Sequence, residues 1–401
     1  MRQNRPSSLA APVESAAMVR GEHTKLTLNA VDVLPEGGLE QKLALGRPLR
    51  VKLGIDVTSP DIHVGRAIPL QRMRAFQDAG HIGVLIIGDY TTKIGDPSGR
   101  SSERPLLSDD EIERNAQTYL EQAMVILDRD KTEVRRNGEW LSKLSYADVV
   151  RLARTITVAR ILERDDFAKR FAAHEPISVS ELLYPLMQAY DSVAVEADVE
   201  LGGTDQLYNL LAGREVMESY GLEPQVILTT PILVAWDGEK MSSSVGNNIP
   251  LLAAPEEQFG RTMRIADELL AQWYALVMEA EVPEGDPMEL KLELARYIVR
   301  RSHGEEAARA AEAYFTRVVR QREAPEEVLV AKLPDGDPLH LPALLVDSLG
   351  ISSTSEARRM IAQGGVKIDG ETVSEVDLPR DRLKGVLIQA GKRRFVRFEA
   401  S

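Results

Sequence analysis

The chain has 401 residues, of which 43% are hydrophobic, and this is enough for two or three domains with separate cores. It contains no cysteine, which excludes disulfides and thiol chemistry, and its net charge of −13 argues against a protein that coats nucleic acid indiscriminately. No apolar run is long enough to span a membrane and no secretory signal pattern is present, so we expect a cytoplasmic protein.

Residues 1–39 are expected to form an N-terminal tail and lead-in. The first part of this segment shows no periodic pattern. The lack of a period is typical of a disordered tail. It is equally typical of a sequence that starts upstream of the true initiator, Met18. The segment is therefore left out of the fold prediction.

A strand-helix-strand unit follows. Residues 49–57 and 81–90 are apolar runs typical of buried strands, and apolar residues at helical spacing lie between them up to Gly80. This unit predicts a parallel sheet that binds ligands at the carboxyl ends of its strands. Pro69 conflicts with a helix interior unless the helix begins near Gly65.

The next segment, residues 106–196, is predicted to be mostly helical. Strand patterns return at 195–206 and 224–233, with a helix between them that ends near Tyr220. The helical segment therefore separates two halves of one sheet and indicates an insertion. We expect a Rossmann-like α/β domain at 40–250 with a helical insertion at about 106–196.

Two further parts complete the chain. Residues 251–332 predict an all-helical domain, and "LPDGDP" at 333–338 is typical of a linker. Residues 338–401 predict a small α+β module of two short helices followed by strands. From His340 to the end, ten Lys or Arg stand against eight Asp or Glu, so this part carries +2 while the remainder carries −15. An RNA contact is therefore expected at the C-terminus.

Polar loops follow two of the predicted strands. "GDPSGR" (95–100) and "GGTDQ" (202–206) both lie at strand carboxyl ends, where glycines let the backbone approach a ligand. Asp96 and Asp205 can accept hydrogen bonds there from an ammonium or a ribose hydroxyl. Each loop taken alone is also consistent with a simple tight turn.

Two other segments suggest a nucleotide site. "GEKMSSSVGN" (238–247) is typical of a mobile phosphate-binding loop in which Lys240 offsets developing charge, or of a solvated serine-rich turn. His63 is typical of a helix cap or core residue. With Arg66 three residues on, however, it can also meet a phosphate at a helix N-terminus.

Together these segments resemble the class I aminoacyl-tRNA synthetases. "DIHVGR" (61–66) and "KMSSS" (240–244) are similar to the HIGH and KMSKS signatures, and "YPLMQAYDSV" (184–193) with "GGTDQ" resembles the tyrosyl-tRNA synthetases. "GDPSGRSSER" (95–104) fits the same group. The C-terminal sixty residues resemble the RNA-binding module that ends bacterial tyrosyl enzymes.

The resemblance implies a tyrosine–tRNA ligase. ATP activates tyrosine to tyrosyl-adenylate with loss of pyrophosphate, and the tyrosyl group passes to the 3′ end of tRNA(Tyr). ATP is a substrate accompanied by Mg²⁺, with no permanent cofactor and no metal site in the protein. The resemblance also implies a homodimer joined through the helical insertion and an anticodon-side role for residues 251–332.

Site residues are carried over by motif position. The catalytic groups are Thr58, His63, Arg66 and Lys240. The ATP-binding residues are Gly54, Asp56, His63, Gly65, Gly202, Asp205, Lys240, Ser242 and Ser243. The tyrosine-binding residues are Lys52, Asp96, Tyr184, Gln188, Asp191, which accepts from the phenol, and Gln206. The tRNA-binding residues are Arg358, Arg359, Lys367, Arg393 and Arg394.

The sequence departs from the family pattern at three positions. Arg66 replaces the last histidine of the first signature, and Ser243 replaces the second lysine of the other, which leaves Lys240 as the cation of its loop. Lys52 stands where some family members have a tyrosine that also binds the phenol.

Three other functions are considered. A tryptophanyl-tRNA synthetase shares the sheet, but Gln188 and the C-terminal module favour tyrosine. An inactive synthetase-like RNA-binding protein is supported by Arg66 and Ser243 and opposed by the other site residues that remain. A nucleotidyl-transfer enzyme that makes a coenzyme precursor lacks the RNA module.

Overall fold

The computed structural model describes residues 23–97, 107–243, 245–320, 329–391 and 394–399. The described residues up to 254, together with 261–294, form one compact unit, and 255–260 with those from 295 onward form a second. The segment predicted as one helical domain at 251–332 is therefore shared between the units. Two of its helices, α11 (Pro255–Thr262) and α13 (Pro287–His303), begin in one unit and end in the other.

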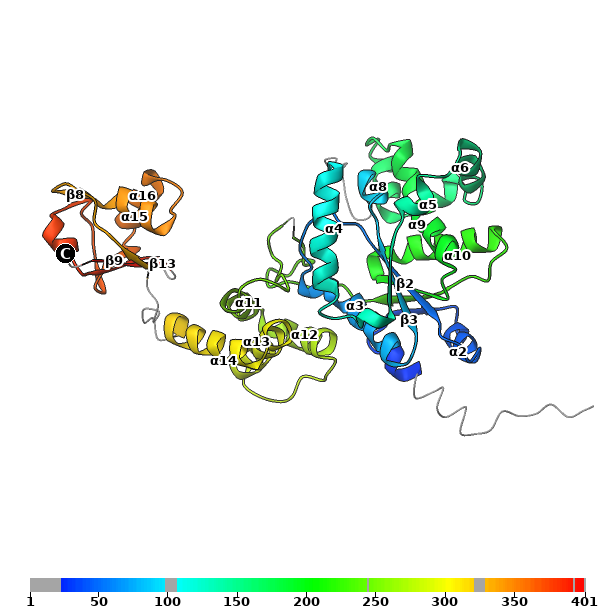
Figure 1. Cartoon of the computed structure of the whole chain (residues 1–401), viewed down its shortest axis with the longest axis horizontal. Helices are drawn as coiled ribbons and strands as arrows, with labels where there is room; N and C mark the ends of the chain where they lie inside the picture. The colour runs from blue at the N-terminus through cyan, green and yellow to red at the C-terminus, as the bar shows by residue number, and fades with distance from the viewer. Residues whose placement is uncertain (1–22, 98–106, 244, 321–328, 392–393, 400–401) are drawn as a thin grey trace, which may run out of the picture. The chain divides into compact units, whose positions relative to one another are not determined.

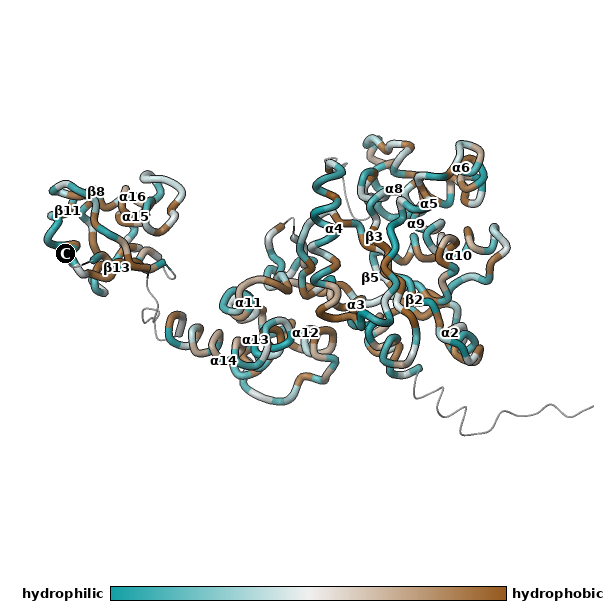
Figure 2. Tube along the Cα trace, viewed as in Figure 1, coloured by the Kyte–Doolittle hydropathy of each residue, from teal (hydrophilic) through white to brown (hydrophobic). Residues whose placement is uncertain are grey.

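A six-stranded sheet forms the centre of the first unit. In order across the sheet its strands are β1 (Asp32–Leu34), β6 (Val226–Thr230), β5 (Val199–Gly203), β2 (Arg50–Ile55), β3 (Ile82–Ile87) and β4 (Thr132–Arg136). β1 is antiparallel to β6, and the other neighbours are parallel. The predicted parallel sheet is confirmed, and Figure 2 shows β3 as a largely hydrophobic stretch.

Two strands depart from the sequence prediction. β1 lies in the predicted lead-in, and β4 lies in the segment predicted as helical. β4 has no apolar run because it is an edge strand whose side chains are partly exposed and paired. Its Glu133 accepts two hydrogen bonds from the Arg50 guanidinium, at 2.8 and 2.7 Å. Hydrophobic periodicity therefore could not predict this strand.

Three helices pack on the sheet. α3 (Val64–Asp78) contacts β2, β3 and β5; α9 (Val179–Val195) contacts β2; and α10 (Leu207–Ser219) contacts β5 and β6 and lies along α9. In Figure 1, β2 and β3 are seen between α3 and the pair α9 and α10. Lys52, Val84 and Glu200 are neighbours in register on β2, β3 and β5, so their side chains share one face of the sheet.

The start of α3 is as the sequence predicts. The helix begins at Val64, next to Gly65, and His63 is its N-cap residue. Pro69 nevertheless lies inside the helix. Because proline has no N–H, the hydrogen bond that this position would donate to the Gly65 carbonyl is absent.

The other helical elements of the first unit are short, apart from α4. Serine or threonine side chains cap α4, α6, α7 and α9 at their N-termini. The elements are α2 (Gly38–Leu43), η1 (Thr91–Lys93), α4 (Asp109–Ala123), η2 (Arg129–Lys131), α5 (Gly138–Leu141), α6 (Tyr146–Ala153), α7 (Val158–Ile161), α8 (Asp165–Ala172), η3 (Thr204–Gln206), η4 (Asp267–Leu269), α12 (Leu270–Trp273) and η5 (Tyr274–Met278).

A shared core joins the helices after β4 to the sheet helices. Leu152 and Phe167 are buried in one cluster with Leu186 of α9 and Val216 of α10. The helices of the insertion are thus fixed to α9 and α10 by apolar packing.

The second unit contains a five-stranded sheet in the order β10 (Glu371–Thr372), β9 (Val366–Ile368), β12 (Leu387–Ala390), β13 (Arg394–Phe398) and β7 (Leu329–Ala331). β8 (Leu339–His340) and β11 (Asp377–Leu378) form a separate pair. The helical elements beside α13 are α14 (Glu305–Tyr314), η6 (Phe315–Arg320), α15 (Leu341–Leu349), α16 (Thr354–Ala362) and η7 (Arg380–Leu383).

The two short helices and the strands predicted after residue 338 are present. The C-terminal sheet, however, begins earlier than the sequence suggests, because β7 precedes the predicted linker and pairs in parallel with β13. Leu333 of that linker is also buried in the C-terminal core with Leu345 and Ile388. The folded C-terminal part therefore includes residues from Leu329 onward. None of the helices in the described ranges is long and apolar enough to cross a membrane.

Candidate active site

His63 lies where the loop after β2 enters α3. Its Nδ1 accepts a hydrogen bond from the Arg66 backbone N–H at 3.3 Å, so the ring proton must be on Nε2. Burial, with further contributions from the cations of Arg66 and Lys240, lowers the pKa of His63 to about 3. At neutral pH His63 is therefore an uncharged donor through Nε2–H, with two positive groups nearby.

The segment after the serine-rich loop is hydrogen-bonded to the histidine loop. The Val64 N–H donates to the Ile249 carbonyl at 2.9 Å, and the Leu251 N–H donates to the Ile62 carbonyl at 2.8 Å. His63 and Pro250 form an isolated β-bridge. These backbone bonds bring together two motifs that are far apart in the sequence.

Lys240 makes an ion pair with Asp205, which follows β5. Its Nζ lies 2.6 Å from Asp205 Oδ2, while the two side chains remain 58% and 32% exposed. Both residues are predicted to bind the nucleotide. The ion pair joins them directly to each other.

Buried Asn247 organises the serine-rich loop. Its Oδ1 accepts from the Ser242 N–H at 2.7 Å, and its Nδ2 donates to the Asp237 carboxylate at 2.9 Å and to the Lys240 carbonyl at 3.2 Å. The neighbouring Asn248 donates to Ser243 Oγ at 3.3 Å. Ser244 lies outside the described residues. No sequence pattern pointed to Asn247.

A second group of predicted residues surrounds the Tyr184 hydroxyl. This hydroxyl donates to Asp56 Oδ2 at 3.0 Å, and Thr91 donates to the other Asp56 oxygen at 2.7 Å. Burial first, and then the negative charges of Asp56, Asp96 and Asp191, raise the pKa of Tyr184 well above its usual value. Asp56, predicted to bind ATP, is thus in direct contact with Tyr184, predicted to bind tyrosine.

Asp96 is bridged to the loop after β5. Gln206 Nε2 donates to Asp96 Oδ2 at 2.9 Å, and Asn209 Nδ2 donates to Gln206 Oε1 at 2.9 Å. The two predicted tyrosine-binding residues Asp96 and Gln206 are therefore in direct contact.

Asp191 lies on α9 with its carboxylate buried. Trp140 Nε1 donates to Oδ1 at 2.8 Å, and Asn137 Nδ2 donates to Oδ2 at 3.3 Å. Burial raises the pKa of Asp191 to about 7, against the opposing effect of the Lys52 charge and these two donors. The prediction missed Asn137 and Trp140 because they follow β4, in the segment predicted as helical.

Lys52 is fully buried beneath α9. Its Nζ donates to the Gln188 carbonyl at 2.9 Å and to Ser192 Oγ at 2.7 Å, and it lies 2.7 Å from Glu200 Oε1. An ammonium group has three N–H donors, so all of them are used. In this arrangement no N–H of Lys52 is left for tyrosine, and the tyrosine-binding role of Lys52 stays a prediction.

The remaining positions around the nucleotide motifs differ in how closely they are packed. A side chain at Gly54 would meet nothing within 4 Å, whereas one at Gly65 would come 3.2 Å from His63 Nδ1, and one at Gly202 would come 3.0 Å from Leu210. Thr58 is half-buried. Arg66 hydrogen-bonds Tyr119, and its Nη1 is buried without a partner among the described residues.

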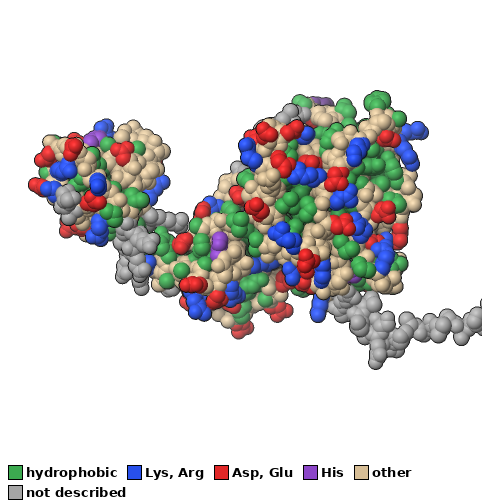
Figure 3. All heavy atoms as spheres, viewed as in Figure 1, with side chains coloured by type: hydrophobic (Ala, Val, Ile, Leu, Met, Phe, Trp, Pro, Cys, Tyr) green, Lys and Arg blue, Asp and Glu red, His purple; other side chains and the backbone are tan. Residues whose placement is uncertain are grey.

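The predicted tRNA-binding residues are exposed in the C-terminal part. Arg358 and Arg359 lie on α16, Lys367 on β9 and Arg394 on β13; Arg393 is outside the described residues. Arg358 lies 3.2 Å from His340 Nε2, and His340 Nδ1 lies 2.6 Å from the Asp377 carboxylate. In Figure 3 acidic and basic side chains are interspersed on the visible face, so no single-sign patch dominates it.

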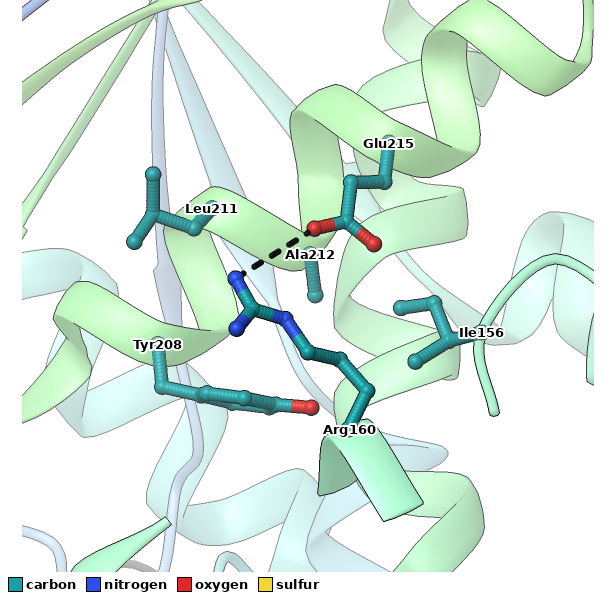
Figure 4. A pocket seen from close by; sticks show the side chains of 6 residues that line it. All are labelled: Ile156, Arg160, Tyr208, Leu211, Ala212 and Glu215. Carbon is teal, nitrogen blue, oxygen red and sulfur yellow. Dashed lines mark ion pairs between the residues drawn. The ribbon is translucent and has the colours of Figure 1, made fainter. Parts of the chain in front are cut away.

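A small depression on α10 is separate from these groups. It is lined by Ile156, Arg160, Tyr208, Leu211, Ala212 and Glu215. Figure 4 shows the Arg160 guanidinium extending over it toward Glu215, at 3.8 Å. None of the predicted site residues lines it.

Comparisons with known proteins match most of the chain. The family model of class I tRNA synthetases (W and Y) matches residues 44–320, and the S4 domain model matches residues 341–378. The family model covers both tryptophan and tyrosine enzymes, so it does not by itself distinguish the two amino acids.

The curated relatives make that distinction. The tyrosine–tRNA ligase of Thermotoga maritima is 46% identical over 387 residues, which is 93% of this chain and 96% of that protein. The tyrosine–tRNA ligase of Moorella thermoacetica is 47% identical over 389 residues, which is 93% of this chain and 94% of that protein. The resemblance predicted from the motifs is confirmed.

Solved structures agree on the fold. The tyrosyl-tRNA synthetase of Archaeoglobus fulgidus, complexed with L-tyrosine, superposes with a TM-score of 0.61 at 24% identity. The superposed region covers 73% of this chain and 99% of the Archaeoglobus fulgidus chain. At this identity the similarity supports the fold alone.

Proposed function

The chain belongs to the tyrosine–tRNA ligases of class I, and on that premise we propose how its own residues divide the work. Enzymes of this family use ATP to activate tyrosine and then aminoacylate tRNA. No protein group needs to act as a nucleophile, because the tyrosine carboxylate attacks the α-phosphorus of ATP. The protein has to align the substrates and stabilise charge on the phosphates.

The hydrogen bonding of the buried Asp191 carboxylate is the observation that supports the proposal. Its two fixed donors, Trp140 and Asn137, leave the carboxylate further lone pairs to accept a hydrogen bond from the phenol hydroxyl. Tyr184, Asp96 and the side chain of Gln188 would hold the tyrosine ammonium. Gln206, held by Asn209, would lie beside the substrate carboxylate.

ATP is proposed to bind at the glycine-lined edge. The open space at Gly54 supports an approach of the nucleotide to the backbone there, whereas Gly65 and Gly202 leave room for the side chains of His63 and Leu210. Asp205 would accept from the ribose, which would release Lys240 from their ion pair and allow it to reach the phosphates. Ser242 and Ser243 would contact the phosphates from the same loop.

Neutral His63 is proposed to donate Nε2–H to a phosphate, and Thr58 and Arg66 would add donors. Mg²⁺ is expected to arrive with ATP. The described residues include no group of three or more acidic or histidine side chains that could hold a metal ion. Phosphate oxygens and water, which Mg²⁺ favours, would therefore hold it.

We also propose a homodimer joined through the insertion. Its helices expose large apolar side chains, of which Val158 is 57%, Phe171 63% and Val179 73% exposed. Hydrophobic side chains are visible in this region of Figure 3. A second copy of the chain would remove this apolar surface from water.

The C-terminal module is proposed to bind the tRNA backbone, with residues 251–332 on the anticodon side. Arg358, Arg359, Lys367 and Arg394 are exposed and supply positive charge to an otherwise acidic chain. ATP and tRNA are cytoplasmic substrates, so we propose a cytoplasmic enzyme.

The first prediction tests the phenol contact. Asp191→Ala should lower the ratio of kcat/KM for tyrosine over phenylalanine by orders of magnitude, because phenylalanine offers the buried wild-type carboxylate no donor in place of the phenol. Discrimination of about 10⁵ is already known for a tyrosyl-tRNA synthetase. Pyrophosphate exchange measured with tyrosine, phenylalanine and tryptophan gives the ratio. An unchanged ratio would place the phenol elsewhere.

The second prediction concerns His63. His63→Ala should slow adenylate formation about 10²-fold or more, roughly 3 kcal/mol in the transition state, with little change in substrate affinity. Single-turnover kinetics and thermal melting measure the two effects. His63→Asn is the matched control, because asparagine keeps the helix cap but lacks the imidazole donor. If His63→Ala melted early and reacted at the normal rate, His63 would be only a structural cap.

The third prediction concerns tRNA binding. Replacing Arg358 and Lys367 by alanine should weaken tRNA binding and lower the slope of log K against log salt by roughly one unit for each phosphate that is no longer neutralised. Pyrophosphate exchange should not change. Arg382→Ala is the control, because Arg382 is an exposed basic residue paired with Glu375 at 3.1 Å. Equal salt slopes for all three proteins would contradict the proposed surface. Point variants are used because a chain ending at Leu333 would remove β13 from β7.

The fourth prediction concerns the dimer. Phe171→Glu should shift the sedimentation of the enzyme from dimer toward monomer at micromolar concentration, because a charge would enter the apolar interface. Tyr314→Glu is the control, since it places the same charge on α14, outside the insertion. A variant that sediments like the wild type would show that the subunits join elsewhere.

A further inference from the structure

A buried group of polar side chains, Lys52, Ser192, Glu200 and Gln225, lies beneath α9 and α10. Lys52 and Glu200 are 0% and 1% exposed, and their charged atoms lie 2.7 Å apart. Ser192 accepts from Lys52 and donates to the other Glu200 oxygen at 3.2 Å, and Gln225 also donates to Glu200. Every charged atom in this group has a partner.

The surrounding backbone leaves space for the group. A side chain at Gly213 of α10 would come 2.5 Å from Gln225 Nε2 and 3.1 Å from Glu200 Oε2. The absence of a side chain at this helix position therefore allows Gln225 and Glu200 to meet under α10.

Lys52 donates hydrogen bonds to α9 on both sides of Asp191. It bonds the Gln188 carbonyl, three residues before Asp191, and the Ser192 hydroxyl, one residue after it. The turn of α9 that carries Asp191 is thus tied to β2.

We propose that Lys52 is a positioning and specificity-determining residue, which aligns Asp191 with the phenol of tyrosine from behind and supplies its buried counter-charge, while Glu200 holds Lys52 in place. The inference rests on the proposed role of Asp191. Lys52 does not contact the substrate in this proposal and acts on it only through Asp191 of α9.

The charges around Asp191 support this role. Lys52 on β2 and Glu200 on β5 face it from the sheet, Tyr184 faces it from its own helix, and Asp56 and Asp96 lie beyond Tyr184. Lys52 lowers the pKa of Asp191 more than Glu200 raises it. Removal of both charges should therefore raise that pKa, and Asp191 would accept from the phenol only at higher pH.

The test compares three variants. Lys52→Met leaves Glu200 as an unpaired buried carboxylate and is expected to lower the thermal midpoint. The double variant Lys52→Met with Glu200→Gln removes that penalty and should recover the midpoint. Lys42→Met is the matched control, because Lys42 is also buried and paired, 3.1 Å from Glu223 and 3.7 Å from Asp198, but does not bond α9.

Pyrophosphate exchange with tyrosine and phenylalanine, from pH 6 to 9, is the readout. In the double variant the tyrosine-to-phenylalanine ratio at pH 7 should remain about 10-fold to 100-fold below wild type, and the ratio should rise at a higher pH. KM for ATP should be unchanged. Lys42→Met should keep the wild-type ratio.

Two results would overturn the inference. If the double variant recovered both its midpoint and its selectivity, Lys52 would be structural only. If Asp191→Ala lowered the ratio and Lys52→Met did not, Asp191 would need no support from Lys52. An unchanged ratio in Asp191→Ala itself would contradict the proposed phenol contact, and with it the basis of this inference.

Discussion

The register between β2 and β5 is the constraint on which the rest of the first unit depends. It places Lys52 beside Glu200 in an interior where neither charge is stable alone. A shift of one residue in either strand would turn the charged side chain of that strand to the opposite face and leave the other charge beside an apolar residue. The pairing of the two strands, the position of α9 and the geometry around Asp191 therefore depend on one another. A mismatch at any of the three would leave a buried charge without a partner.

A second constraint brings the two signature motifs together. Short backbone hydrogen bonds connect residues 62–64 with 249–251, so the serine-rich loop is tethered close to the helix that begins after His63. Asn247 adds side-chain bonds across the same loop. The loop can therefore change shape between its fixed ends without moving away from the histidine. Its position is set by main-chain bonds, which tolerate substitution of the side chains along it.

Much of this architecture could be predicted from the sequence, for identifiable physical reasons. β3 and β6 are almost entirely buried and are mostly apolar, and β2 is recognisable in the same way although Arg50 and the buried Lys52 interrupt it. The motifs that follow such strands must gather at one edge of the sheet. β4 could not be predicted in the same way, because its charged side chains are satisfied by partners such as Arg50, far away in the sequence. The donors to Asp191 were missed with it. Lys52 was assigned to the ligand by alignment, since a sequence does not show that all three of its N–H groups already have acceptors.

The ion pair of Lys240 and Asp205 has a consequence for the population of loop conformations. Both side chains are partly exposed, and such pairs contribute about 0.2–1 kcal/mol. At the upper limit the paired form outnumbers the unpaired form by only roughly fivefold. The loop with a free Lys240 is then a substantial fraction of the ligand-free protein, so the ATP binding proposed for Lys240 would use a conformation that already exists. The pair neutralises two partly exposed charges without imposing a slow opening step.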